Sequence, residues 1–360
     1  MAVIFVVRNV PWYDQCSDPS APGDRWSLVR EADGCEARRP QGAVHLSREA
    51  CASLQCTPGL RSSLEGARID ILVLLAGIYL LATGAWALRW HRLLSLAGAD
   101  IPFLTAWRLT LQGMAGSVFL PGSIGGDALR VAFALGKGAS PVVVVATVLL
   151  DRGVGLVTLA AVASVFAFAC SGADAGPVAW ILASFPVAFG LALLVARSPQ
   201  VARLKQPTWG WWMRLVRPVF DYITSKGAPR ALFQGALAST VLSLVNLLAI
   251  RGIVFALGVS PTEERWIYVG AAMAFIIEAI PALPGGWGTA DAAFVVFLAR
   301  AGLPPSTALA VSLLYRMLNY VSALVGAALY VAHGRRHAEE RGAREVTRVE
   351  VSRASVGASR

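Results

Sequence analysis

The feature that most constrains this chain is a succession of long apolar stretches. Three of them, Ile71–Leu88, Pro177–Ala196 and Ser306–Ala332, are each about long enough to cross ~30 Å of hydrocarbon as a helix. Further apolar stretches carry a charged residue inside them: Pro141–Cys170, Ala231–Leu257 and Trp266–Leu283. With 56% apolar and only 15% charged residues, the sequence predicts an all-α polytopic membrane protein with about seven or eight membrane segments.

The charges between these stretches predict how the chain is oriented. Lys and Arg outnumber acids seven to one in Arg197–Arg230 and seven to four in Arg335–Arg360, and Arg89 and Arg92 end the first full stretch. The positive-inside rule places these regions, and with them the C-terminus, in the cytoplasm. The short connections that carry acids suit the outer side: 171–176 and 260–265. The net charge of +10 therefore reflects topology, and we expect no nucleic-acid partner.

Residues 1–68 differ from the rest, so we divide the chain into an N-terminal extramembrane segment (1–68), a membrane domain (69–333) and a basic cytoplasmic tail (334–360). The first segment balances eight Arg against eight acids and holds four of the five cysteines: Cys16, Cys35, Cys51 and Cys56. It would face outward, where disulfides persist, although four cysteines allow three pairings and unpaired thiols are the alternative. Its start, "MAVIFVVRNV", reads as the end of a membrane helix, so we expect a start codon further upstream.

A Gly- and Pro-rich motif that carries an Asp occurs twice, as "LPGSIGGDALR" at 120–130 and "LPGGWGTADAA" at 283–293. Each Asp is followed 25 residues later by an Arg, which gives Asp127 with Arg152 and Asp291 with Arg316. The loop residues of the two motifs are Pro121, Gly122, Gly125 and Gly126 in the first copy, and Pro284, Gly285, Gly286 and Gly288 in the second. The shared order of loop, Asp, short apolar segment, Pro and Arg predicts an internal duplication over about 101–170 and 266–332.

The expected topology inverts the two copies. The stretch after the first motif runs outward, and the stretch after the second runs inward because the basic tail follows it. The segments between, 128–137 and 292–301, are too short to cross alone, so each is a half-helix or part of a re-entrant hairpin. Broken helices in inverted repeats are typical of transport sites, and helix starts at that depth favour anions. A simple surface turn is the alternative.

Several charged residues interrupt stretches that are otherwise mainly apolar: Arg108, Asp151, Arg152, Arg251, Glu278 and Arg316. Each costs about 2.5–3.5 kcal/mol at a helix centre, so each is expected to have a partner or a watery cavity. The candidate partners of Arg152 and Arg316 are Asp127, Asp151 and Asp291. The two arginines either form ion pairs that lock the copies together or bind phosphate through the planar guanidinium. Arg108 is a candidate to line the cavity.

The two motifs, with "TVLLDR" and "LLYR" after them, resemble the membrane region of bacterial lysylphosphatidylglycerol synthases and their stand-alone flippase-like relatives, over roughly Asp70–His333. The resemblance implies a flippase-type module of the bacterial inner membrane, which moves phospholipids or glycolipids with charged head groups between leaflets. Carried over by position, the family's motif also includes Arg130 and Asp151. Asp291 stands where the family usually has Glu, which keeps the carboxylate.

These observations predict a non-enzymatic lipid transporter with a membrane phospholipid or glycolipid as its partner and no cofactor or metal. Arg152 and Arg316, with Asp127 and Asp291, would form a central head-group site. The alternative is a membrane component or scaffold of a lipid-modifying transferase that lacks its own catalytic domain. Only a short Arg- and Glu-rich segment follows His333, and the four His flank apolar stretches. A second copy of the chain or a lipid-synthesising enzyme is a further candidate partner.

Overall fold

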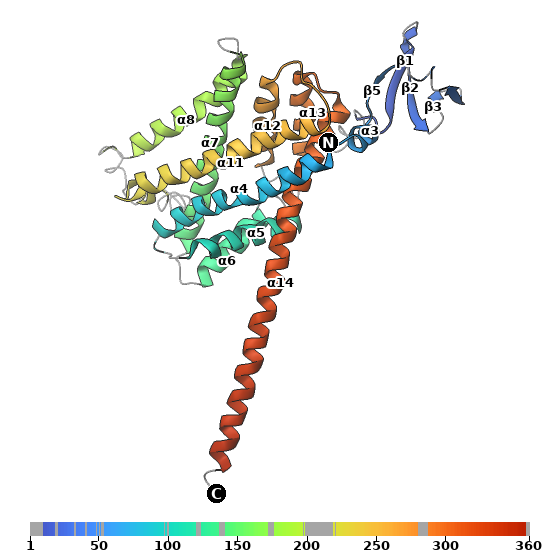
Figure 1. The fold of residues 1–360 in the computed structure, drawn as a ribbon. Coiled ribbons are helices and arrows are strands. Elements are labelled where there is room, and N and C mark those ends of the chain that lie inside the picture. Colours follow the sequence, from blue (N-terminus) through green and yellow to red (C-terminus); the bar gives the residue numbers. More distant parts are fainter. Residues whose placement is uncertain are drawn as a thin grey trace.

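The protein is described here by a computed structural model, which has a small β-sheet unit attached to a helical bundle (Figure 1). The residues that the structure describes are 10–18, 21–31, 34–39, 42–47, 49, 51, 54–96, 98, 101–119, 124–136, 141–171, 176–196, 198, 219, 221–279 and 287–357. Statements about structure below refer to these residues.

The β-sheet unit has five antiparallel strands in the order β4-β3-β2-β1-β5. The strands are β1 (Asp14–Asp18), β2 (Ala21–Glu31), β3 (Gly34–Arg39), β4 (Gly42–Ser47) and β5 (Gln55–Thr57). One disulfide, Cys16–Cys56, joins β1 to β5, and a second joins Cys35 to Cys51. So small a sheet buries little apolar surface, and disulfides compensate for that. The sequence left the pairing open and did not predict the sheet.

The sheet is attached to the bundle through the short helix α3 (Leu60–Glu65). The buried carboxylate of Asp14 accepts hydrogen bonds from the Gly59 amide, at 2.7 Å, and from the Ser62 hydroxyl. On the other side, the Ser306 hydroxyl donates to the carbonyl of Pro58. The sheet therefore lies at the end of the bundle where the last long helix begins, and we call this end the sheet side.

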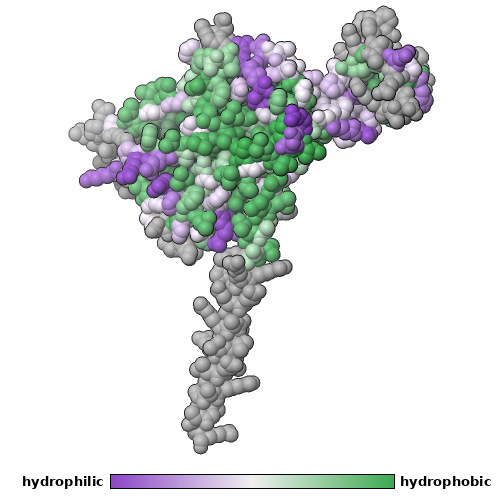
Figure 2. Space-filling model, in the orientation of Figure 1, coloured by the Kyte–Doolittle hydropathy of each residue, from purple (hydrophilic) through white to green (hydrophobic). Residues whose placement is uncertain are grey.

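Five helices in the described part of the chain are long and apolar enough to cross a membrane. They are α4 (Ile69–Leu96), α7 (Pro141–Ser171), α8 (Gly176–Ala196), α11 (Ala228–Ala256) and α14 (Pro305–Gly357). Apolar side chains cover most of the bundle surface seen in Figure 2, as expected for helices that face lipid. The protein is thus a multi-pass membrane protein, as the sequence predicted.

Four shorter helices form two hairpins inside this bundle. The first consists of α5 (Phe103–Phe119) and α6 (Ile124–Gly136), and the second of α12 (Arg265–Glu278) and α13 (Thr289–Leu298). The two helices of each pair are antiparallel neighbours. In the first pair the Gly126 amide donates to the Ser117 hydroxyl at 3.1 Å. In the second pair the Thr262 amide, before α12, donates to the carbonyl of Ala301, just beyond α13, at 2.9 Å. Of the two alternatives for the short segments, the structure has the hairpin.

The loops at the tips of the two hairpins lie outside the described residues, and so do the motif residues Pro121, Gly122, Pro284, Gly285 and Gly286. The described motif glycines show why the residue type is needed. Gly126 packs so close to α5 that an added Cβ would lie 2.6 Å from the Gly113 carbonyl oxygen. Gly288 has φ +79°, a conformation that residues with a Cβ rarely adopt.

Candidate functional site

The first copy of the motif forms an ion pair between α6 and α7. Arg152 donates through Nε to Asp127 Oδ2 at 2.7 Å and makes a second contact with the same oxygen. Asp127 lies in the first turn of α6, where the helix dipole favours a negative charge. The Arg152 side chain is 32% exposed and the Asp127 side chain 15% exposed, so this pair is only partly enclosed by its neighbours.

The second copy forms the corresponding pair between α13 and α14. Arg316 donates through Nη2 to Asp291 Oδ1 at 3.0 Å, and the two side chains are 8% and 5% exposed. Asp291 also accepts hydrogen bonds from the Ser312 hydroxyl, at 2.6 Å, and from the Gly288 amide, at 2.8 Å. The ring of Trp287 covers the Arg316 guanidinium, with 4.3 Å between the guanidinium carbon and the ring centroid. This carboxylate is held on three sides.

Asp151 does not pair with either motif arginine. It binds Arg89 of α4, with 3.0 Å between Arg89 Nη2 and Asp151 Oδ2, and it accepts a hydrogen bond from the Trp86 indole at 3.1 Å. Arg89 also donates to the Ser239 hydroxyl of α11 at 2.8 Å. The sequence placed Arg89 at the cytoplasmic end of a span, but α4 continues to Leu96 and Arg89 is buried. Because α4 extends beyond the apolar stretch that ends at Leu88, Arg89 is not the last residue of the helix but lies within it.

Arg130, which only the resemblance suggested, lies behind these pairs. It is buried, with its Nη1 3.6 Å from Asp127 and 3.9 Å from Asp151. Its guanidinium carbon stands 4.5 Å from the ring centroid of Trp86 and 5.4 Å from that of Trp90. Aromatic faces stabilise a buried guanidinium. Two arginines of the first copy and Arg89 of α4 therefore surround the carboxylates of Asp127 and Asp151.

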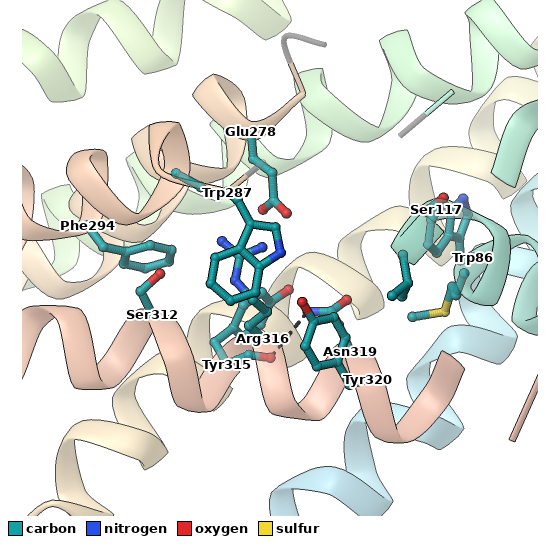
Figure 3. Close-up of a pocket in the computed structure, with 13 residues that line it drawn as sticks. Trp86, Ser117, Glu278, Trp287, Phe294, Ser312, Tyr315, Arg316, Asn319 and Tyr320 are labelled. Atoms are coloured by element: carbon teal, nitrogen blue, oxygen red, sulfur yellow. Dashed lines mark hydrogen bonds between the residues drawn. The ribbon is translucent and has the colours of Figure 1, made fainter. Parts of the chain in front are cut away.

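Two cavities open onto these charges. The first cavity, with a volume of about 220 Å³, is lined by two ion pairs, Arg152 with Asp127 inside the first copy and Arg89 of α4 with Asp151. The second cavity, about 160 Å³, is lined by Arg316 together with aromatic and small polar side chains (Figure 3). Three residues line both cavities and form the wall between them: Trp86, Glu278 and Tyr315. Each motif arginine thus faces its own cavity, and the cavities meet at one wall.

Glu278 is the last residue of α12, and its carboxylate points toward the second cavity beside Trp287 and Arg316 (Figure 3). Within the described part of the chain it has no hydrogen bond and no ion pair. The sequence selected Glu278 as a charge that interrupts an apolar stretch, and the structure places it where both cavities can reach it.

Four of the charged sequence candidates do not line either cavity: Arg130 and Asp291, whose contacts are given above, and Arg108 and Arg251. Arg251 of α11 binds Glu264, the residue just before α12. Arg108 of α5 is also absent from both cavity walls. Conversely, the sequence missed the aromatic lining, which includes Trp86, Trp287, Tyr315 and Tyr320. Two of these aromatic residues could have been found from their place in the sequence, because Trp287 lies inside the second motif and Tyr315 directly precedes Arg316.

The fold and the site together define a helical multi-pass membrane protein with a polar, charged centre built on two short hairpins. The family described as the lysylphosphatidylglycerol synthase TM region matches residues 58–326. The chain belongs to this family, which confirms the resemblance seen in the two motifs. No curated protein and no solved structure matches the chain.

Proposed function

We propose that this protein moves phospholipids or glycolipids with charged head groups between the leaflets of the bacterial inner membrane, and that it catalyses no chemical reaction. The observation that carries the proposal is the side chain of Arg152, which lines the first cavity and is 32% exposed. Guanidinium groups bind phosphate oxygens through two parallel hydrogen bonds. A charged group inside a membrane that faces a cavity marks a path for polar substrates.

The contacts at the sheet side support an inverted repeat. The start of α4 meets the end of α11 there, where the Arg68 amide donates to the Ala256 carbonyl at 2.9 Å. Phe166, near the end of α7, stacks on Tyr268, near the start of α12, with 4.4 Å between ring centroids. Helix α7 thus ends at the side where α14 begins. Inverted copies allow a central site to open first to one leaflet and then to the other.

The rim of the second cavity suits a lipid rather than a free solute. Val118 and Trp287 line this cavity and are also exposed on the surface of the bundle. A head group could enter between them while its acyl tails stay in the bilayer. This arrangement removes the need to move the tails through the protein interior.

The disulfides of the sheet unit support its place outside the cell, because such bonds persist in oxidising compartments. With the sheet side outside, α14 runs inward and its basic C-terminal part lies in the cytoplasm, as the positive-inside rule also predicts.

The test is movement of tail-labelled phospholipid in vesicles that contain the purified protein, measured as the label that a membrane-impermeant reductant can reach. Wild-type protein should move lipid faster than protein-free vesicles. The single variant Arg152→Gln and the double variant R152Q/D127N should both lose this movement if Arg152 binds phosphate. If the Arg152–Asp127 pair is only structural, the double variant leaves neither residue without its partner and should move lipid at the wild-type rate. That result would contradict the proposal.

A second candidate is a membrane component of a lipid-modifying transferase, because the description of the family names a synthase. In that case wild-type vesicles would move no lipid. Loss of the protein from cells would then lower the amount of the modified lipid, whereas loss of a transporter would change only its distribution between leaflets.

A further inference from the structure

The carboxylates at the centre of the bundle are not equivalent. Asp127 pairs with Arg152, Asp151 with Arg89, and Asp291 with Arg316. Glu278 has no such partner among the described residues, although it lies in the wall of both cavities. Residues 280–286, which lie outside the described part of the chain, include no charged residue in their sequence. Glu278 is therefore a carboxylate that no described side chain pairs with.

An unpaired carboxylate is costly inside a membrane, at about 2.5–3.5 kcal/mol on insertion scales. Ionisable groups inside a membrane that face a cavity mark the path of substrates or ions. Its surroundings favour a cationic ligand, because Trp86, Trp287 and Tyr315 contribute aromatic rings to the cavity walls (Figure 3). Aromatic faces attract ammonium groups, most strongly in a site from which water is excluded.

We propose that Glu278 binds the cationic nitrogen of the lipid head group, so that the protein selects zwitterionic phospholipids with one ammonium beside their phosphate. This inference rests on the proposed lipid transport. Glu278 lines the first cavity together with Arg152 and the second together with Arg316. In either cavity a phosphate can lie at the arginine while the ammonium stays at the glutamate. The phosphate would pass from one arginine to the other across the shared wall.

A purely anionic head group meets the opposite situation. Its phosphate would find the same arginines, but the charge of Glu278 would remain uncompensated and would repel it. A head group with two ammonium groups would find only one unpaired carboxylate. The charge arrangement therefore predicts a preference for one ammonium per phosphate.

The experiment compares tail-labelled phosphatidylethanolamine with its N-acetylated form, which keeps the phosphate and the backbone but loses the cation. Wild-type vesicles should move phosphatidylethanolamine about tenfold faster than either the N-acetylated lipid or phosphatidylglycerol, a ratio that corresponds to ~1.4 kcal/mol. Lysylphosphatidylglycerol, with two ammonium groups, should move no faster than phosphatidylethanolamine. Glu278→Gln should lower the phosphatidylethanolamine rate to that of the N-acetylated lipid, and Glu278→Asp should keep a preference for phosphatidylethanolamine.

The matched control is Glu264→Gln. This residue lies just before the start of the same helix and outside both cavities, so the variant should leave the ratio of the two lipid rates unchanged.

Two results would overturn the inference while leaving lipid transport intact. One is equal movement of phosphatidylethanolamine, its N-acetylated form and phosphatidylglycerol by the wild-type protein. The other is a Glu278→Gln variant that keeps the wild-type preference, which would mean that a proton neutralises Glu278 and that the amide replaces the protonated acid.

If the wild-type protein moves no lipid, the proposed function fails, and binding still decides the role of Glu278. Short-chain phosphatidylethanolamine, but not its N-acetylated form, should raise the thermal unfolding temperature of the wild-type protein in detergent, because a ligand that binds the folded state stabilises it. The same lipid should have no such effect on Glu278→Gln. An equal rise for both proteins would overturn the inference.

Discussion

The two copies of the motif place the same Asp and Arg, at the same spacing, in different surroundings. In the first copy Arg152 is 32% exposed and Asp127 15% exposed, whereas in the second Arg316 is 8% and Asp291 5% exposed. Asp291 has hydrogen bonds from the Ser312 hydroxyl and the Gly288 amide in addition to its arginine. The first copy has more positive charge nearby, supplied by Arg89 and Arg130.

The difference shows that a repeated sequence motif need not contribute equally to stability and to binding. The second pair is more enclosed and its carboxylate has several donors, so we expect it to stabilise the fold more. The first pair lines the larger of the two cavities and its arginine side chain is more exposed, so we expect it to contribute more to binding. Each of the following substitutions tests whether the two copies differ in this way.

The largest expected effect is the loss of the enclosed carboxylate. Asp291→Ala leaves Arg316 buried without its ion-pair carboxylate and removes the acceptor for Ser312 and Gly288. Breaking a buried pair costs about 3–5 kcal/mol, whereas a partly exposed pair contributes about 0–1 kcal/mol. Asp127→Ala should therefore destabilise the protein much less.

The measurement is unfolding in detergent, followed by heat or denaturant for both variants under the same conditions. The double variant D291A/R316M should recover much of the lost stability, because neither member of the pair is left buried without the other. Equal losses for Asp291→Ala and Asp127→Ala would show that the two pairs are equivalent.

The next effect concerns the motif glycines. An alanine Cβ at position 126 would lie 2.6 Å from the Gly113 carbonyl oxygen and 2.7 Å from the Ser117 hydroxyl oxygen, and such overpacking costs about 1–3 kcal/mol. In the second copy Gly288→Ala strains the backbone instead, at about 1–2 kcal/mol. Gly153→Ala is the matched control, since nothing lies within 4 Å of its Cβ position on α7. It should leave the unfolding temperature unchanged or raise it slightly, and a loss at position 153 as large as at 126 would refute the packing argument.

The sequence predicted the two pairs but not their surroundings, and the reason is physical. Asp127 with Arg152 and Asp291 with Arg316 are set by spacing along the chain, which a sequence shows directly. The partnership of Asp151 with Arg89 is set by how α4 packs against α7, and no spacing encodes it. Arg89 also resembled a boundary charge, because the apolar stretch ends at Leu88 although the helix continues.

The sequence did not predict the β-sheet unit, for a different reason. Its strands alternate weakly, and much of its stability is expected from the two disulfides rather than from an apolar core. Four cysteines in a neutral segment indicated disulfides, but pairing depends on strand order, with β5 beside β1. The cavities could not be predicted either, because their walls combine residues from several helices.

A smaller effect separates the copies by function rather than by stability. Arg152→Lys keeps the charge but loses the planar fork that binds phosphate, so lipid movement should fall about tenfold, or ~1.4 kcal/mol in activation free energy, with the unfolding temperature unchanged. Arg316→Lys loses the stacking on Trp287 and should lower the unfolding temperature. Arg92→Lys, on an exposed position of α4, is the control for a lysine substitution as such. Unchanged lipid movement for Arg152→Lys would assign the first pair to structure as well.

The smallest perturbation tests the inversion of the copies without changing the site. Cys170 is the free cysteine of the chain and is exposed near the end of α7, 43 residues after Asp127. Gly334 stands at the aligned position, 43 residues after Asp291. If the copies are inverted, a membrane-impermeant maleimide added to intact spheroplasts should label Cys170 in the wild-type chain. The double variant C170S/G334C should react only after the membrane is permeabilised, and Cys170→Ser alone should not react at all. Labelling of both positions from the same side would mean that the copies run parallel, and the alternating use of Arg152 and Arg316 would then lose its structural basis.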